Sequence, residues 1–218
     1  MDSKNVIRRY GFGCLLEFDS EPVPRSFAQW IADHVNTRSG DIVLDTKVIP
    51  MSSESVHMVL GIPLGGRPMK FNIDATKSAF LEVIGKDSLP TIKFFGSSIM
   101  KGKLDEDELV RNFLVVALSV FLCPNSNTFP STKYLGALIN PKEAKDFDMS
   151  KFVFEWLIAY IRKYKRDCQK PSDGPTTLGG CIYKLAVSKL FCSFSLFYFA
   201  AYIILIFFVT CCFVVLNL

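Results

Sequence analysis

The sequence predicts a mainly α-helical globular domain with a small β-hairpin, followed by one C-terminal transmembrane-type helix. Three observations lead to this fold class. Apolar residues recur at helical spacing between proline and glycine breaks, two β-branched runs flank Asp45-Thr46, and residues 190–218 carry no charged side chain. We therefore divide the chain into a helical domain at residues 1–170, a linker at residues 171–189 and a hydrophobic segment at residues 190–216.

The first expected elements are a helix and the hairpin. Residues 23–36 (VPRSFAQWIADHVN) place Phe27 and Ile31 on one stripe shortly after a proline, which favours a helix. Residues 41–51 (DIVLDTKVIPM) contain the two β-branched runs, and Pro50 ends the second of them.

Two further helices have marked ends. Residues 52–61 begin with serines that can serve as N-caps, and Gly61 stands before a proline at the other end. Residues 74–85 are bracketed by Asp74 and Gly85, again a polar start and a glycine stop.

Residues 105–124 (DEDELVRNFLVVALSVFLCP) are the most apolar segment before the tail. Four carboxylates in the first turn complement the helix dipole. The expected inward stripe consists of Leu109, Phe113, Val116/Ala117 and Val120. The apolar part is about half as long as a bilayer core is thick, so we expect a core helix surrounded by protein.

The last expected helix of the domain covers residues 148–168. Its predicted stripe consists of Val153, Leu157, Tyr160 and Tyr164, and basic residues gather in its last turns. Residues 169–180 carry two prolines and three glycines and are typical of a connection.

Composition favours a cytosolic or nuclear compartment for the domain. All 25 basic and 21 acidic residues lie at or before Lys189, and the net charge of +4 is too small to indicate nucleic-acid binding by itself. The N-terminus lacks the pattern of a secretory signal, and the seven cysteines include no C-x-x-C pair. Reduced thiols are therefore expected.

Candidate catalytic residues are few. The two histidines, His34 and His57, fall inside predicted helices, and a Cys–His pair with Cys14 or Cys123 is possible only arithmetically. The acidic run 105–108 is better explained as a helix start than as a cation site. We assign no catalytic, cofactor-binding or metal-ligating residue, and we expect no cofactor and no small-molecule substrate.

Two glycine-rich turns and one basic cluster remain as possible binding features. The turns at residues 61–67 and 174–180 lack the phosphate-binding patterns, although Arg67 leaves an anion contact open at the first. The cluster consists of Arg162, Lys163, Lys165, Arg166 and Lys170. It fits a solvated helix end, nuclear import, nucleic-acid phosphates or an anionic membrane surface.

Several phrases carry a family resemblance. The phrases VIRRYGFGCLLEF, VPRSFAQWIADHVN, VIPMSSESVHMVLGIPLGG and TTLGGC occur in this order over residues 6–181. In them the sequence resembles the plant mobile domain family, which is labelled "aminotransferase-like" and linked to transposable elements. The resemblance implies a helical module that contacts protein or nucleic acid. It transfers no catalytic residue, because no lysine stands in a recognisable cofactor-binding context.

The tail has two interpretations. Leu190–Leu216 would be about 40 Å long as a helix, against about 30 Å of hydrocarbon, and Lys184 and Lys189 favour a cytosolic domain. Only two residues follow this segment in the sequence, so the protein would insert after translation as a tail-anchored protein. Relatives in the resembled family continue past Cys181 with another helix, so we also hypothesise a truncated domain with translated intron beginning near residues 182–184.

Three functions follow from these observations. The first is a non-enzymatic interaction module, transposon-related by the resemblance, with an unknown protein or nucleic-acid partner. The second is a tail-anchored membrane protein, held through residues 190–216, with a cytosolic helical domain. The third is an enzyme, for which no recognisable constellation exists. Without the tail, the domain is expected in the nucleus or cytosol.

Overall fold

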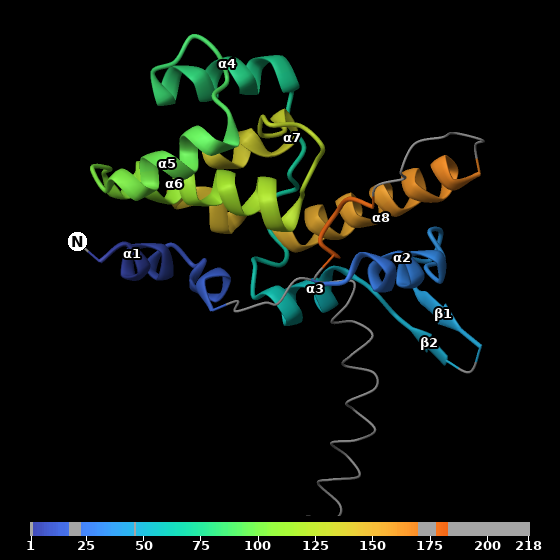
Figure 1. Cartoon of the computed structure of the whole chain (residues 1–218). Helices are drawn as coiled ribbons and strands as arrows, with labels where there is room; N and C mark the ends of the chain where they lie inside the picture. Colours follow the sequence, from blue (N-terminus) through green and yellow to red (C-terminus); the bar gives the residue numbers. More distant parts are fainter. Residues whose placement is uncertain (1, 18–22, 46, 170–177, 183–218) are drawn as a thin grey trace, which may run out of the picture.

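Two hydrophobic cores meet on helix α8 (Met149–Cys168), which extends from the middle of the fold to the right in Figure 1. The first half of α8 contributes Met149, Val153 and Trp156 to the larger core, which α1, α3–α7 and their connections complete. The second half contributes Leu157 and Ile161 to a smaller core with α2 and the hairpin. One helix therefore joins both parts of the domain.

The structure, a computed structural model, describes residues 2–17, 23–45, 47–169 and 178–182. In it, η denotes a short 3-10 turn, except η2, which is π-helical. The elements in chain order are α1 (Ser3–Arg9), η1 (Gly13–Leu16), α2 (Arg25–Asp33), β1 (Ile42–Leu44), β2 (Lys47–Ile49), α3 (Ser53–Leu60), α4 (Ile73–Ile84), α5 (Ile92–Lys101), α6 (Glu106–Ala117), η2 (Leu118–Leu122), α7 (Thr132–Leu135), η3 (Gly136–Leu138), η4 (Pro141–Asp146) and α8.

The described residues form a mainly helical domain with a two-stranded antiparallel hairpin, which confirms this part of the predicted fold class. Strands β1 and β2 pair in the register Ile42 with Ile49 and Val43 with Val48. The alternation of side chains across a strand buries the first pair against α8 and leaves the second pair exposed.

The helix ends follow local side-chain chemistry. The Ser52 side chain accepts from the Ser55 N–H at the start of α3, and Gly61 ends that helix at a φ of 62°. Asp105 and Glu108 form a capping box at the start of α6. At α4 the structure differs from the prediction by two residues, because Asn72 rather than Asp74 is the N-cap.

Helix α6 lies in the core as predicted, but a different face points inward. Its buried row includes Val110 and Leu114 and continues to Leu118 in η2. Val120 is 62% exposed, so the predicted stripe is wrong at this position. The segment is apolar on almost every side, and the hydrogen bond from the Cys123 N–H to the Leu118 carbonyl closes a π turn that changes the phase of the last residues.

Residues 178–182, assigned by the sequence to the linker 171–189, pack back on α8. A β-carbon on Gly179 would lie 2.3 Å from the ring of Tyr160, and one on Gly180 would lie 2.9 Å from the side chain of Leu157. Cys181 is fully buried in the larger core with Cys123. We call residues 178–182 the clasp. The described helices include none that is long and apolar enough to cross a membrane, and the predicted transmembrane segment 190–216 lies outside the described residues.

Candidate functional site

The connection between α3 and α4 crosses the start of α8 and builds the candidate site. We call residues 61–70 the strap. Two of its carbonyls are held by α8: the Ile62 carbonyl accepts from the Ser150 hydroxyl at 3.0 Å, and the Pro63 carbonyl accepts from the Ser150 N–H at 2.9 Å. Ser150 is fully buried, so this residue fixes the strap at its first half.

The second half of the strap pairs with the residues just before α8. The Arg67 N–H donates to the Asp146 carbonyl and the Asp148 N–H donates to the Arg67 carbonyl, both at 2.8 Å, which forms a short parallel bridge. Gly66 makes this approach possible, because a β-carbon there would lie 2.3 Å from the Asp146 oxygen.

The sequence analysis named Arg67 as a possible contact for an anion. In the structure its side chain instead contacts residues of the protein itself. Its guanidinium donates to Glu143 at 2.6 Å and lies 4.4 Å from the centre of the Phe147 ring. The hydrogen bond from Arg67, with a second from Asn140, lowers the pKa of Glu143 below its ordinary value. The glycine-rich turn 61–67 therefore has a structural role as the first part of the strap.

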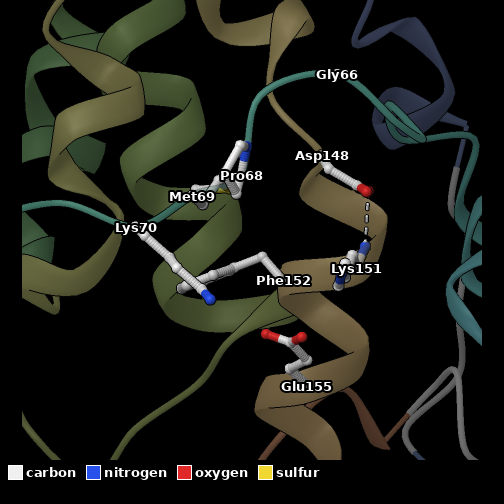
Figure 2. Close-up of a pocket in the computed structure, with 8 residues that line it drawn as sticks. All are labelled: Gly66, Pro68, Met69, Lys70, Asp148, Lys151, Phe152 and Glu155. Atoms are coloured by element: carbon white, nitrogen blue, oxygen red, sulfur yellow. Dashed lines mark hydrogen bonds between the residues drawn. The ribbon is translucent and has the colours of Figure 1, made fainter.

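A pocket of about 270 Å³ lies between the second half of the strap and the first turns of α8 (Figure 2). Its lining residues are Gly66, Pro68, Met69, Lys70, Asp148, Lys151, Phe152 and Glu155. Met69 is only 6% exposed and Phe152 is half-buried, so the pocket has an apolar floor. Phe152 begins an aromatic row on α8 that continues with Trp156 and Tyr160 at ring distances of 5.7 and 5.4 Å.

Charged side chains surround this apolar floor. Asp148 is committed as the N-cap of α8, where its carboxylate accepts from the Lys151 N–H at 3.0 Å. Lys70 reaches from the strap and Glu155 from α8 toward the same opening (Figure 2). In the described part of the chain, no ion pair joins Lys70, Lys151 or Glu155 to another residue. Their charges therefore remain available to a ligand.

The two histidines do not form a catalytic pair with the cysteines. The Nδ1 of His57 donates to the Ile62 carbonyl at 2.7 Å, and the Nδ1 of His34 is 2.7 Å from the Trp30 carbonyl. Cys14 is exposed and has no hydrogen bond to either histidine among the described residues. Burial, followed by the nearby Cys181, raises the pKa of Cys123 well above its ordinary value, the opposite of an activated thiolate.

The acidic run has structural partners. Asp105 and Glu108 cap α6, Glu106 pairs with Arg9 at 2.5 Å, and Asp107 accepts from the Tyr10 hydroxyl. Asp107 also pairs with Lys142 at 3.0 Å. The described residues contain no group of three or more His, Cys, Asp or Glu side chains that could hold a metal ion.

The basic cluster divides into two parts. Arg162 donates to the Thr37 carbonyl at 2.6 Å, and Lys165 donates to the carbonyls of Asp33 and Val35, so both bind the chain where α2 ends. Lys163 and Arg166 are exposed on α8. Lys170 and most of the second glycine-rich turn, residues 174–177, lie outside the described residues.

Sequence reasoning missed the residues of the pocket. Lys70 and Glu155 come from distant parts of the chain and are brought together by the contact between Gly66 and Asp146. The double glycine of the strap was a signal for a close backbone approach, but the sequence does not show which segment approaches it.

Comparison with known families assigns the chain. The family described as "Domain of unknown function (DUF8566)" matches residues 1–186. The chain belongs to this DUF8566 family. No curated protein and no solved structure matches the chain.

The DUF8566 match corrects the resemblance drawn from the sequence. The assignment to the plant mobile domain family is wrong, and the "aminotransferase-like" and transposon-related descriptions that depended on it are wrong as well. The phrases behind it are rich in helix caps and glycine turns, which many helical domains share for physical reasons. The match continues past Cys181 to residue 186, so the hypothesis of a truncated domain loses the comparison on which it depended. The hypothesis of a translated intron remains a prediction.

Proposed function

We propose that this DUF8566 protein is a non-enzymatic interaction module that binds a partner macromolecule at the strap and the first turns of α8. The observation that carries the proposal is the pocket, where an apolar floor of Met69 and Phe152 is surrounded by the charges of Lys70, Lys151 and Glu155. Apolar surface with a few convergent polar groups is the usual composition of a binding site. The engaged histidines and the high pKa of the Cys123 thiol give no support to a nucleophilic mechanism.

A photoreactive benzoylphenylalanine in place of Lys151 tests the proposal in cells that express the full chain. We expect a discrete crosslinked product that the second substitution Lys70→Glu weakens. The same group in place of the exposed Lys103, between α5 and α6, is the matched control and is expected to give no such product. Equal products from both positions contradict a site at the pocket. A hydrolase activity of the full chain that Cys14→Ser or Cys123→Ser abolishes contradicts the non-enzymatic assignment.

A second proposal concerns residues 190–216, which we infer to be a single membrane-spanning segment with the helical domain on the cytosolic side. Its support comes from the sequence: no charged residue follows Lys189, the length suffices for a bilayer core, and Lys184 and Lys189 precede the segment. A domain without the segment is expected in the cytosol or nucleus.

Cell fractionation with alkaline washing tests this second proposal. We expect the full chain to remain with membranes and the chain lacking residues 184–218 to become soluble. A full chain with Ile204→Arg and Ile206→Arg keeps the length but places charges in the apolar segment, and it is expected to lose membrane integration. Retention of this variant in the washed membranes would count against a spanning segment.

A further inference from the structure

The size of the pocket sets what can enter it. Apolar cavities of about 150 Å³ hold a benzene ring, and sites for drug-sized molecules begin near about 300 Å³. At about 270 Å³, the pocket between the strap and α8 accommodates one large side chain with some space around it. It is too small for an extended cofactor.

The floor of the pocket favours an apolar side chain. Met69 is 6% exposed, and its flexible thioether can adapt to the shape of a ring or an aliphatic chain. Phe152 is half-buried, and Trp156 supports its ring from the next turn of α8 at 5.7 Å. A ligand ring would therefore meet a methionine and the exposed part of a fixed aromatic ring, which are favourable partners for aromatic groups.

The charges around the floor favour acidic residues beside that side chain. Lys70 and Lys151 line the pocket, and the Lys133 ammonium lies 5.5 Å from the centre of the adjacent Trp156 ring. Two acidic residues, Asp148 and Glu155, also line the pocket. The positive end of the α8 dipole partly offsets the charge of Asp148, which caps that helix, so Glu155 is the main opposing charge. Further along the exposed face of α8 come Lys163 and Arg166. The surface is thus complementary to an acidic segment.

We infer that the pocket binds a large apolar side chain presented by an acidic peptide segment of a partner protein. This inference rests on the interaction function proposed above and names its ligand. A nucleic acid fits the lining less well, because the arginine of the strap, Arg67, is engaged with Glu143 and Phe147 and is not available to a phosphate. Glu155 acts as a specificity residue that keeps the acidic groups on the side of Lys70 and Lys151.

A synthetic peptide with phenylalanine at its centre and aspartate or glutamate on both sides is the probe. Its affinity for the full chain in detergent is measured by fluorescence anisotropy. We expect it to bind about tenfold more tightly than the same peptide with alanine at the centre, because the ring enters the apolar floor. A third peptide with lysine flanks is expected to bind more weakly than either.

Charge variants locate the binding. Lys70→Glu and Lys151→Glu are expected to weaken binding of the acidic peptide several-fold each, and Glu155→Gln is expected to strengthen it. Lys103→Glu makes the same charge change away from the pocket and is the matched control. All four side chains are exposed, so the substitutions leave the fold in place.

Methionine methyl resonances give a direct readout of the site. The Met69 methyl signal is expected to shift on addition of the phenylalanine peptide, whereas those of Met58 and Met100, which are 77% and 86% exposed elsewhere, stay in place. Binding without a Met69 shift overturns the inference, as does a single-stranded oligonucleotide that shifts Met69 at lower concentration. Absence of peptide binding together with a specific crosslink from residue 151 overturns this ligand assignment and leaves the interaction function standing. Absence of both overturns the interaction function as well.

Discussion

The α-carbon of Gly66 lies against the backbone of Asp146, so that a β-carbon on the glycine would be 2.3 Å from the Asp146 carbonyl oxygen. Gly66 also has a φ of 85°, in the region that side-chain-bearing residues rarely adopt. This contact seats the strap on the residues before α8, and the pocket forms beside it. The backbone of this glycine therefore allows the second half of the strap to meet the residues before α8.

Replacing this glycine is expected to destabilise the fold. Gly66→Ala combines a strained φ with a backbone clash, and we expect a loss of about 2–3 kcal/mol in the free energy of unfolding. Gly65→Ala is the matched control, because its φ is 79° but a β-carbon there meets nothing within 4 Å. It should cost about 1 kcal/mol from strain alone. Chemical unfolding followed by circular dichroism measures both, and equal losses would show that the close approach contributes nothing.

The helices with polar starts and glycine stops were predictable from the sequence because their ends depend on neighbouring residues. Ser52, Gly61 and Asp105 act where the sequence placed them. Helix α5 was not predicted, and it has Gly96 in its interior and no side-chain cap at its start. The four-residue α7 was also missed, because so short a helix gives no measurable periodicity.

The candidate site was not predictable because it depends on contacts between distant segments. Lys70 and Lys151 are ordinary surface lysines in the sequence. The pairing of Arg67 with Asp146 and Asp148, together with the hydrogen bonds from Ser150 to the strap, brings their elements together. The position of the clasp was not predictable from the sequence either. Residues 178–182 have the composition of a connection, but Cys181 is buried in the core.

Arg111 is expected to be a strong determinant of stability. It is 7% exposed, and its guanidinium donates to the carbonyls of Leu138 and Ile139 at 3.1 and 3.3 Å, which joins α6 to the end of η3. Arg111→Met fills similar space but leaves these carbonyls without the donor, for an expected loss of about 2–3 kcal/mol in the free energy of unfolding.

Arg9→Met is the control for this substitution. Arg9 pairs with Glu106 on the surface and its side chain is 61% exposed, so its loss should cost less than about 1 kcal/mol. Urea unfolding of the two variants in parallel separates the cases. A smaller effect at Arg111 than at Arg9 would show that the buried hydrogen bonds are replaceable by water.

Alkaline pH is expected to weaken the contact between α1 and α6. Burial, the hydrogen bond to Asp107 and the charge of that carboxylate raise the pKa of Tyr10 from 10.0 to about 12. A pKa raised in the folded state gives stability that is complete below pH 10 and is lost as the pH rises from 10 to about 12. Tyr10→Phe should remove this part of the alkaline loss.

The same contact predicts an effect at acid pH. The hydrogen bond from Tyr10, followed by that from Lys142, lowers the pKa of Asp107 below its ordinary 3.8. The stability it gives is present above pH 3.8 and is lost as the pH falls through the folded-state pKa. Melting temperatures of the wild type and of Tyr10→Phe over both ranges measure the two effects. Tyr164→Phe is the control for the acid range. Burial also raises the pKa of Tyr164 to about 12, so this variant should remove its own share of the alkaline loss, but Tyr164 lies in the smaller core and should leave the acid range unchanged. Unchanged pH profiles of Tyr10→Phe would contradict the contact.

Thiol reactivity is expected to report the clasp. Cys14 and Cys168 are exposed, whereas Cys123 and Cys181 are buried. Brief alkylation of the native full chain, followed by peptide mass spectrometry, should therefore modify the first pair and spare the second. Alkylation of Cys181 at the rate of Cys168 would show that the clasp does not hold in solution.

A glycine in the clasp provides the mutational test. Gly180 has a φ of 87°, and a β-carbon there would lie 3.1 Å from the α-carbon of Leu157, which cannot move without moving α8. Gly180→Ala should therefore displace the clasp and expose Cys181 to alkylation. The alkylation rate of Cys123 should rise less, because Cys123 is held at the end of η2. Gly85→Ala is the matched control. Gly85 also has a positive φ, of 61°, but a β-carbon there meets open space, so the substitution introduces backbone strain and no steric clash. If both alanine variants leave Cys181 equally protected, the approach of Gly180 to Leu157 does not hold the clasp on α8.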